Sequence, residues 1–265
     1  MNKSLFVLAV LATLSAPAFA HQAATPFYGG QTAASGDLHV EFAIRDGGLR
    51  VWVRDHAEKP VAATGKVTLL LGGAKSEITL RADGDRLVGE APVKTADKVV
   101  AVLALSAGGK AVSARFGQEA LVQPALNAGA SVGQGLFAAN CASCHGASLR
   151  GTDQGPPLLH AWYAPGGGHD DTQVLKVIGN GTQGHMWKFG DMPKPEGVKA
   201  GQEKDILAYI RAMQVANGIG SAPAAAMPNM DGHAAAWGAC RALTGWGEAD
   251  TLDRGQISGG CFPLM

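Results

Sequence analysis

Two cysteines three positions apart, followed at once by a histidine, are the residues of this chain best suited to chemistry. They are Cys141, Cys144 and His145. Two thiols at this spacing can add across the two vinyl groups of a porphyrin, and the adjacent imidazole can then bind the iron. The motif therefore predicts one covalently bound haem c, held by Cys141 and Cys144, with His145 as the proximal iron ligand.

The same cysteine pair has two alternative interpretations, a zinc site and a redox-active dithiol. A zinc site needs two further ligands at matching spacing, but the other two of the four cysteines, Cys240 and Cys261, lie far along the chain. A thioredoxin-type pair is expected next to a βαβ pattern, which this sequence lacks. Haem attachment is the interpretation that the motif favours.

The residues on both sides of the motif strengthen this interpretation. Residues 133–140 lead into it with glycines and a phenylalanine, a glycine-proline-proline stretch follows at 155–157, and an apolar-periodic run occupies 206–213. In this order the segments resemble the class I c-type cytochromes over about residues 128–216. The resemblance implies an all-α haem domain that carries single electrons.

The resemblance also implies how this domain packs. Gly133 and Phe137 would pack the first helix across the last, against Ile206 and Tyr209. A proline of the 155–157 stretch would resemble the family's proline, whose carbonyl group accepts a hydrogen bond from the proximal imidazole.

Two methionines compete for the sixth position on the iron. Met192 is followed by a proline and lies 17 residues before Tyr209, as the resemblance leads us to expect of the axial methionine. Met186 precedes a Phe-Gly-Asp sequence that follows the axial methionine in other relatives, but Trp187 stands where those relatives have proline. We predict Met192 as the axial ligand and keep Met186 as the alternative, with His185 as a third candidate.

Two further histidines, His160 and His169, are interpreted as surface residues or as neighbours of the haem propionates rather than as iron ligands.

The first twenty residues have the composition of a cleavable signal peptide. Lys3 precedes an apolar stretch that is too short to span a bilayer, and residues 18–20 form an Ala-x-Ala cleavage site. We therefore expect an exported, periplasmic protein that begins at His21, with no transmembrane segment in the mature chain.

Residues 37–116 alternate apolar and polar side chains in short runs separated by glycine turns. The pattern predicts about seven antiparallel strands that form a β-sandwich of immunoglobulin-like architecture. Strands are expected at 38–44, 49–54, 66–71, 75–81, 86–90, 98–105 and 110–116, with a tight hairpin at Asp46-Gly47 between the first two.

Several histidines suggest copper chemistry as an alternative. His39 is placed beside Glu41 on the polar face of the first predicted strand, His56 follows an aspartate, and cleavage would expose His21 at the amino terminus. We favour histidines without a metal ligand role. Whether these residues or the tail bind copper stays open.

We divide the chain into a signal peptide (1–20), a sandwich with its linker (21–125), a cytochrome domain (126–216) and a flexible tail (217–265). Cys240 and Cys261 in the tail could form a disulfide in an oxidising compartment. The fold class is thus α plus β and multidomain, with an antiparallel β-sandwich before an all-α cytochrome domain.

The charge of the chain limits the classes of partner. Lys and Arg number 22, and Asp and Glu also number 22. This balance gives no reason to expect nucleic acid as a partner. We expect redox proteins instead, such as a dehydrogenase or a terminal oxidase. The predicted function is a one-electron carrier rather than an enzyme. The alternatives are the cytochrome subunit of an exported oxidoreductase and a copper-handling periplasmic protein with a haem domain.

Overall fold

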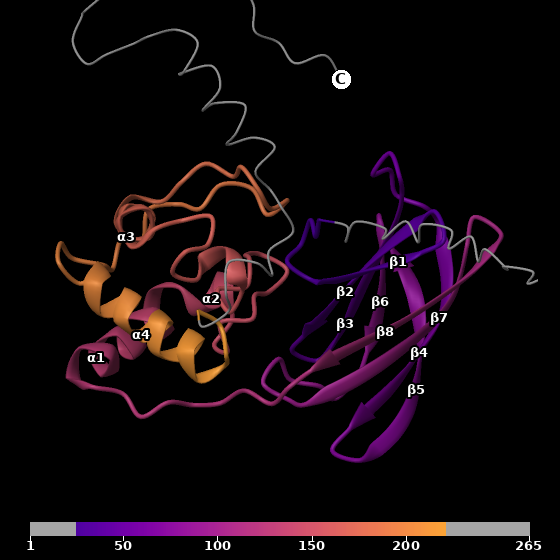
Figure 1. Cartoon of the computed structure of the whole chain (residues 1–265), viewed down its shortest axis with the longest axis horizontal. Coiled ribbons are helices and arrows are strands. Elements are labelled where there is room, and N and C mark those ends of the chain that lie inside the picture. Colours follow the sequence, from indigo (N-terminus) through magenta and orange to yellow (C-terminus); the bar gives the residue numbers. More distant parts are fainter. Residues whose placement is uncertain (1–24, 221–265) are drawn as a thin grey trace, which may run out of the picture. The chain divides into compact units, whose positions relative to one another are not determined.

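A computed structural model describes residues 25–220 of the chain. Within these residues, antiparallel strands come first and helices follow (Figure 1). The predicted fold class, an antiparallel β domain before an all-α domain, is confirmed. The predicted signal peptide, His21 and the pair Cys240 and Cys261 lie outside the described residues.

The β domain contains eight strands among the described residues. They are β1 (Gln31–Ser35), β2 (Leu38–Arg45), β3 (Gly48–Asp55), β4 (Ala63–Leu71), β5 (Ala74–Asp83), β6 (Arg86–Glu90), β7 (Val99–Ala107) and β8 (Lys110–Gln118). Their hydrogen-bonded order is β1-β2-β3-β6-β5-β4-β7-β8, and all pairs are antiparallel.

Strand β5 divides this order into two sheets. Residues Ala74–Leu80 of β5 pair with β4, whereas Arg81–Asp83 pair with β6. One sheet thus contains β1, β2, β3, β6 and the end of β5, and the other contains the start of β5 with β4, β7 and β8. These are the neighbour relations of a constant-type immunoglobulin sandwich, and β1 is an added strand on the free side of β2.

The hairpin between β2 and β3 has the turn that its sequence predicts. Arg45 pairs with Gly48, which leaves Asp46 and Gly47 as a two-residue loop. Gly47 has a φ of +82°, a left-handed conformation that glycine adopts without a steric penalty. The turn sets the register in which Phe42 pairs with Val51.

The core of the sandwich lies between the two sheets. Phe42 of β2 stacks on Phe116 of β8, with ring centroids 5.1 Å apart. Val67 and Leu103 are fully buried in the same cluster. The alternation of apolar residues along each strand therefore places one face of each sheet in this shared core.

The polar-face assignment of Glu41 is wrong, because this side chain is fully buried. Its carboxylate oxygens accept hydrogen bonds from the backbone N–H groups of Phe27, Tyr28 and Gly30 at 2.7–2.9 Å. Arg54 adds an ion pair at 3.2 Å. A buried carboxylate is tolerated here because donors surround it, and alternation along the strand cannot reveal that.

The helical domain follows. Its α-helices are α1 (Ala128–Asn140), α2 (Ala142–His145), α3 (Asp171–Asn180) and α4 (Glu203–Ala216), and a 3-10 helix spans Ala161–Tyr163. No helix in the described part of the chain combines the length and the apolar character needed to cross a membrane.

Helices α1 and α4 pack across each other at a glycine (Figure 1). A Cβ atom on Gly133 would overlap the backbone carbonyl of Asp205. One turn further along, Phe137 lies 5.5 Å from Tyr209 between ring centroids, and Ile206 is fully buried beside them. The packing expected from Gly133 and Phe137 against the last helix is confirmed.

Candidate functional site

The helical domain encloses an apolar cavity of about 940 Å³, measured to include the space at its open mouth. Its walls come from α1, α2, α3, α4 and the loops between them. Most of the lining side chains are aliphatic or aromatic, with few polar groups among them. A cavity of this size and character suits a large, flat, apolar group with one reactive centre.

Two of the three motif residues line this cavity. Cys141 ends helix α1, where its N–H donates to the carbonyl of Phe137 at 2.9 Å, and His145 ends the single turn of α2. Cys144 lies one residue before His145 and is half-buried, but it is not among the lining residues. The C-terminal end of α1 and the short helix α2 thus place the thiol of Cys141 and the imidazole of His145 at the cavity.

The imidazole of His145 is held in one tautomer. Its Nδ1–H donates to the carbonyl oxygen of Pro156 at 2.9 Å, since a carbonyl oxygen can only accept. The lone pair of the neutral ring is therefore on Nε2. Burial lowers the pKa of His145 below its ordinary value, and the bond to Pro156 opposes this only in part. A buried neutral imidazole with a free Nε2 has the form that binds a metal.

The two thiols are not joined in a disulfide. Burial, and then the neighbouring Cys144, raise the pKa of Cys141 to about 11. The thiol of Cys141 is thus protonated at neutral pH. A buried, protonated thiol of this kind is a poor thiolate nucleophile, which argues against a redox-active dithiol at this site.

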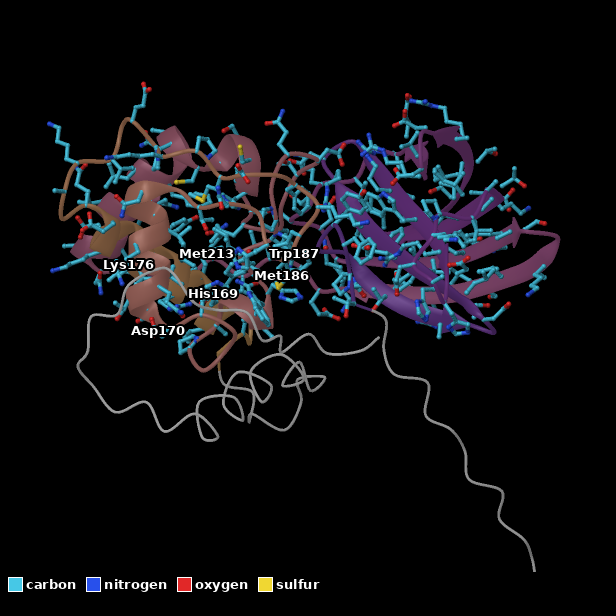
Figure 2. The ribbon with its side chains drawn as sticks, turned by 90° about the horizontal axis from the view of Figure 1, so that it is seen from above. His169, Asp170, Lys176, Met186, Trp187 and Met213 are labelled. Atoms are coloured by element: carbon cyan, nitrogen blue, oxygen red, sulfur yellow. The ribbon has the colours of Figure 1, made fainter. Side chains whose placement is uncertain are left out.

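Both candidate axial methionines line the cavity, as does His185. Met192 forms an isolated antiparallel bridge with Thr182, in which each residue donates an N–H to the other's carbonyl at 2.8–2.9 Å. Met186 lies in a bend next to Trp187 (Figure 2). The backbone of Met192 is thus fixed by two hydrogen bonds, while both sulfur-bearing side chains remain candidates.

Aromatic and histidine side chains close the cavity near Met186. The indole N–H of Trp187 donates to the hydroxyl of Tyr163 at 2.8 Å. The Nε2 atoms of His169 and His185 lie 3.3 Å apart. His160 does not line the cavity, and its Nδ1 accepts from the N–H of Trp162 at 3.2 Å, as the N-cap of the 3-10 helix.

One wall of the cavity comes from helix α3, which the sequence reasoning did not predict. Val174, Val177 and Ile178 of this helix line the cavity. Their spacing fits one helical face, and Asp170 with Gln173 forms a capping box at its start. These two signals in the sequence could have identified the helix.

The histidines of the sandwich lie apart from this cavity. His39 Nδ1 lies 3.2 Å from a carboxylate oxygen of Glu58, and its ring contacts that of His56 edge-on. Among the described residues, no group of three or more histidine, cysteine or acidic side chains is arranged to hold a metal ion.

In the helical domain, His145 and the loop that carries Met186 and Met192 line the same apolar cavity. Residues 130–214 match the family model described as Cytochrome c, so this stretch is a cytochrome c domain fused to an antiparallel β-sandwich. The Cytochrome c family binds covalently attached haem c. Neither the curated proteins nor the solved structures compared with the chain include a match.

The residues of the cavity fit haem c. The walls are apolar, Cys141 and His145 both line the cavity, and the tautomer of His145 leaves a lone pair on Nε2. The family match suggests electron transfer rather than catalysis. Electron transfer implies redox partners.

Proposed function

We propose that the chain is an exported electron carrier that holds one haem c through thioether bonds to Cys141 and Cys144. His145 and Met192 are the proposed axial ligands. Haem bound in this way supplies a one-electron centre. The hydrogen bond from His145 Nδ1 to Pro156 is the observation that carries the proposal, because it leaves Nε2 as the ring nitrogen that can bind the iron.

The residues of the chain have separate tasks in this proposal. Pro156 fixes the tautomer of His145 and strengthens its basicity. The apolar side chains of α3 and α4 exclude water from the cavity, which favours the less charged ferrous state. Two protein ligands leave no open coordination position for a substrate, and this favours electron transfer over catalysis.

Haem attachment can be tested directly. Haem should remain with the polypeptide through denaturing electrophoresis, as seen by haem staining, and the double change Cys141→Ala and Cys144→Ala should abolish the stain. Cys141→Ala alone should retain one thioether and hence some stain. Complete release of haem from the unmodified chain would contradict the proposal.

Export is proposed from the sequence of residues 1–20. Mass spectrometry of the haem-bearing protein from the periplasm should give the mass of a chain that begins at His21 plus one haem. A haem-bearing chain that retains Met1 would contradict export by cleavage, and a mass with two haems would contradict the single-haem proposal. The redox partner would be a dehydrogenase or a terminal oxidase in the same compartment.

A further inference from the structure

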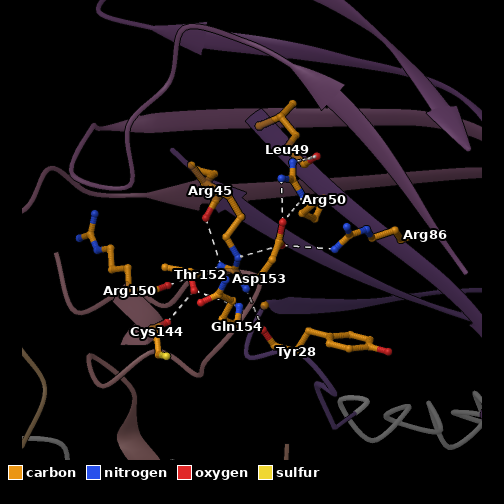
Figure 3. A network of polar contacts seen from close by, with 12 residues as sticks. Tyr28, Arg45, Leu49, Arg50, Arg86, Cys144, Arg150, Thr152, Asp153 and Gln154 are labelled. Carbon is orange, nitrogen blue, oxygen red and sulfur yellow. Dashed lines mark hydrogen bonds and ion pairs between the residues drawn. The ribbon is translucent and has the colours of Figure 1, made fainter. Parts of the chain in front are cut away.

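The loop between the haem motif and Pro156 is held by the sandwich domain. Three arginines of the sandwich surround the carboxylate of Asp153 (Figure 3). Arg50 donates from Nε and Nη2 to Oδ2 at 3.0 and 2.8 Å. Arg86 and Arg45 lie 3.4 and 3.7 Å from Oδ1. Arg50 thus donates two hydrogen bonds to one carboxylate oxygen, while Arg45 and Arg86 lie near the other oxygen.

Arg45 is the buried member of this group. Its side chain is 6 % exposed, and burial lowers its pKa to about 10, while the charge of Asp153 opposes that change. Arg45 also donates to the carbonyl of Tyr28 at 3.0 Å. A buried guanidinium without its carboxylate is costly, so Arg45 and Asp153 depend on each other.

Further bonds fasten the same loop at its start. The hydroxyl of Ser148 donates to Thr95 at 2.7 Å, and Arg150 donates to the carbonyl of Thr95 at 2.7 Å. Within the loop, the hydroxyl of Thr152 donates to the carbonyl of Cys144 at 2.6 Å. The sandwich therefore restrains the backbone that joins Cys144 to Pro156, the acceptor of His145.

The loop that carries the candidate axial methionines also contacts the sandwich domain. The N–H of Lys188 donates to the carbonyl of Phe27 at 2.8 Å, and its ammonium lies 3.9 Å from the centre of the Phe27 ring. Phe189 meets the ring of Tyr28 edge-on at 6.0 Å. Residues 27–30 thus form a surface against which residues 187–189 pack.

Glu41 fixes that surface. Three backbone N–H groups within residues 27–30 donate to its buried carboxylate, and Arg54 contacts both this carboxylate and the Phe27 ring. Burial raises the pKa of Glu41, so the bonds of these donors must offset the cost of removing the carboxylate from water. The segment at 27–30 has no regular secondary structure, and Glu41 supplies the bonds that a strand partner would supply.

We propose that the sandwich domain positions both loops of the haem site, with Asp153 and Glu41 as the positioning residues. Asp153 acts on the His145 side through the loop that contains Pro156. Glu41 acts on the methionine side through Phe27 and Tyr28. This inference rests on the proposed function, and it gives the sandwich a structural role at the haem site.

The test compares the rate at which cyanide binds to the ferric holoprotein, since cyanide enters when the methionine loop opens. Glu41→Gln should raise this rate about tenfold, because it removes a charge-assisted restraint on the methionine loop. Asp153→Asn and Arg50→Gln act on the His145 side, so each should leave the cyanide rate nearly unchanged and instead raise the reduction potential, because a weaker bond from His145 to Pro156 lowers the basicity of the imidazole. Arg50→Gln changes only the sandwich. Combining it with Asp153→Asn should add little to either single change, since both remove the same contact.

Glu77→Gln is the matched control. Glu77 carries the same charge on the same domain, but its exposed ion pair is with Lys66 of the neighbouring strand. Cyanide binding to this variant should match the unmodified protein. If all of the variants bind cyanide at the rate of the unmodified protein and keep its reduction potential, the inference is overturned. If Glu41→Gln does not fold, Phe27→Leu probes the methionine side, and an unchanged rate in that variant would overturn the Glu41 part.

A second measurement, an absorption spectrum of the ferric protein, distinguishes failure of this inference from failure of the proposed function. A thioether bound to low-spin ferric iron gives a weak absorption band at the red end of the visible spectrum, here called the thioether band. If the unmodified protein lacks the thioether band, the proposed methionine ligation fails. If the band is present but Glu41→Gln binds cyanide no faster and Asp153→Asn keeps the reduction potential, only the positioning role fails.

Discussion

The Nδ1 atom of His145 lies 2.9 Å from the carbonyl oxygen of Pro156, across the loop that joins them. The contact binds the end of a short helix to a residue eleven positions later. It sets the ring plane and leaves Nε2 as the only nitrogen able to bind iron.

The first prediction separates the two methionines. Met192→Ala should abolish the thioether band and lower the reduction potential, because the ligand that favours the ferrous form is lost. Met186→Ala should leave both nearly intact. Spectra of the ferric proteins and potentiometric titration provide the measurements. The reverse pattern would assign the ligand to Met186.

The second prediction concerns the crossing of α1 and α4. Gly133→Ala should lower the free energy of unfolding by about 1–3 kcal/mol, because the added methyl group overlaps the backbone at Asp205 and Ile206. Gly135 of the same helix has open space at its Cβ position. Gly135→Ala should therefore stabilise the helix by about 0.5–1 kcal/mol. Denaturant unfolding of the two variants checks the opposite signs.

The third prediction concerns Gln214, which is fully buried in α4. Its amide donates to the carbonyls of Leu158 and Tyr163 at 2.8 and 3.2 Å. Gln214→Met keeps the shape but removes the donors, and should cost about 1–3 kcal/mol of unfolding free energy. Val215 beside it is 73 % exposed, so Val215→Ala should change stability by less than about 0.5 kcal/mol. Equal effects in chemical denaturation would contradict a specific role for Gln214.

The fourth prediction is a pH dependence. Burial lowers the pKa of His160 below its unfolded value, and its Nδ1 must stay unprotonated to accept from Trp162. As the pH falls below about 6.5, the unfolded chain binds a proton that the folded chain resists, so stability falls with pH. His160→Asn keeps an N-cap acceptor but does not titrate.

This substitution should therefore reduce the loss of unfolding free energy between neutral pH and pH values below 6.5. Denaturant titrations of both proteins at each pH measure the difference. Other groups titrate equally in the two chains. Parallel pH profiles would show that His160 contributes nothing to the dependence.

Much of the fold could be predicted because it follows from local patterns. Alternation identified strands β2 to β8, whereas the helix crossing at Gly133 and Phe137 was implied by the resemblance to the class I c-type cytochromes. Strand β1 was missed, since Gln31–Ser35 contains no large apolar side chain and depends on pairing with β2 for its structure. Helix α3 was missed although Asp170 and Gln173 form a capping box at its start.

The site divides in the same way. The spacing of Cys141, Cys144 and His145 can be read from the sequence. The structure was needed to show that Pro156 is the proline whose carbonyl accepts the hydrogen bond from His145. The contacts of Asp153 and Glu41 could not be predicted. Each contact joins residues far apart in the chain. The periodicity of apolar residues and the spacing of motifs do not indicate which arginine or backbone N–H will contact a given carboxylate.

The arginine group around Asp153 also affects the order in which the chain is assembled during synthesis. The strands that carry Arg45, Arg50 and Arg86 are made before Asp153, and domains generally fold as units from the amino terminus. A nascent sandwich would thus hold Arg45 and Arg50 without the carboxylate of Asp153, while Arg86 already pairs with Asp83. Once residue 153 has been made, its carboxylate can pair with these arginines. The helical domain thus supplies a negative charge that neutralises positive charge in the sandwich.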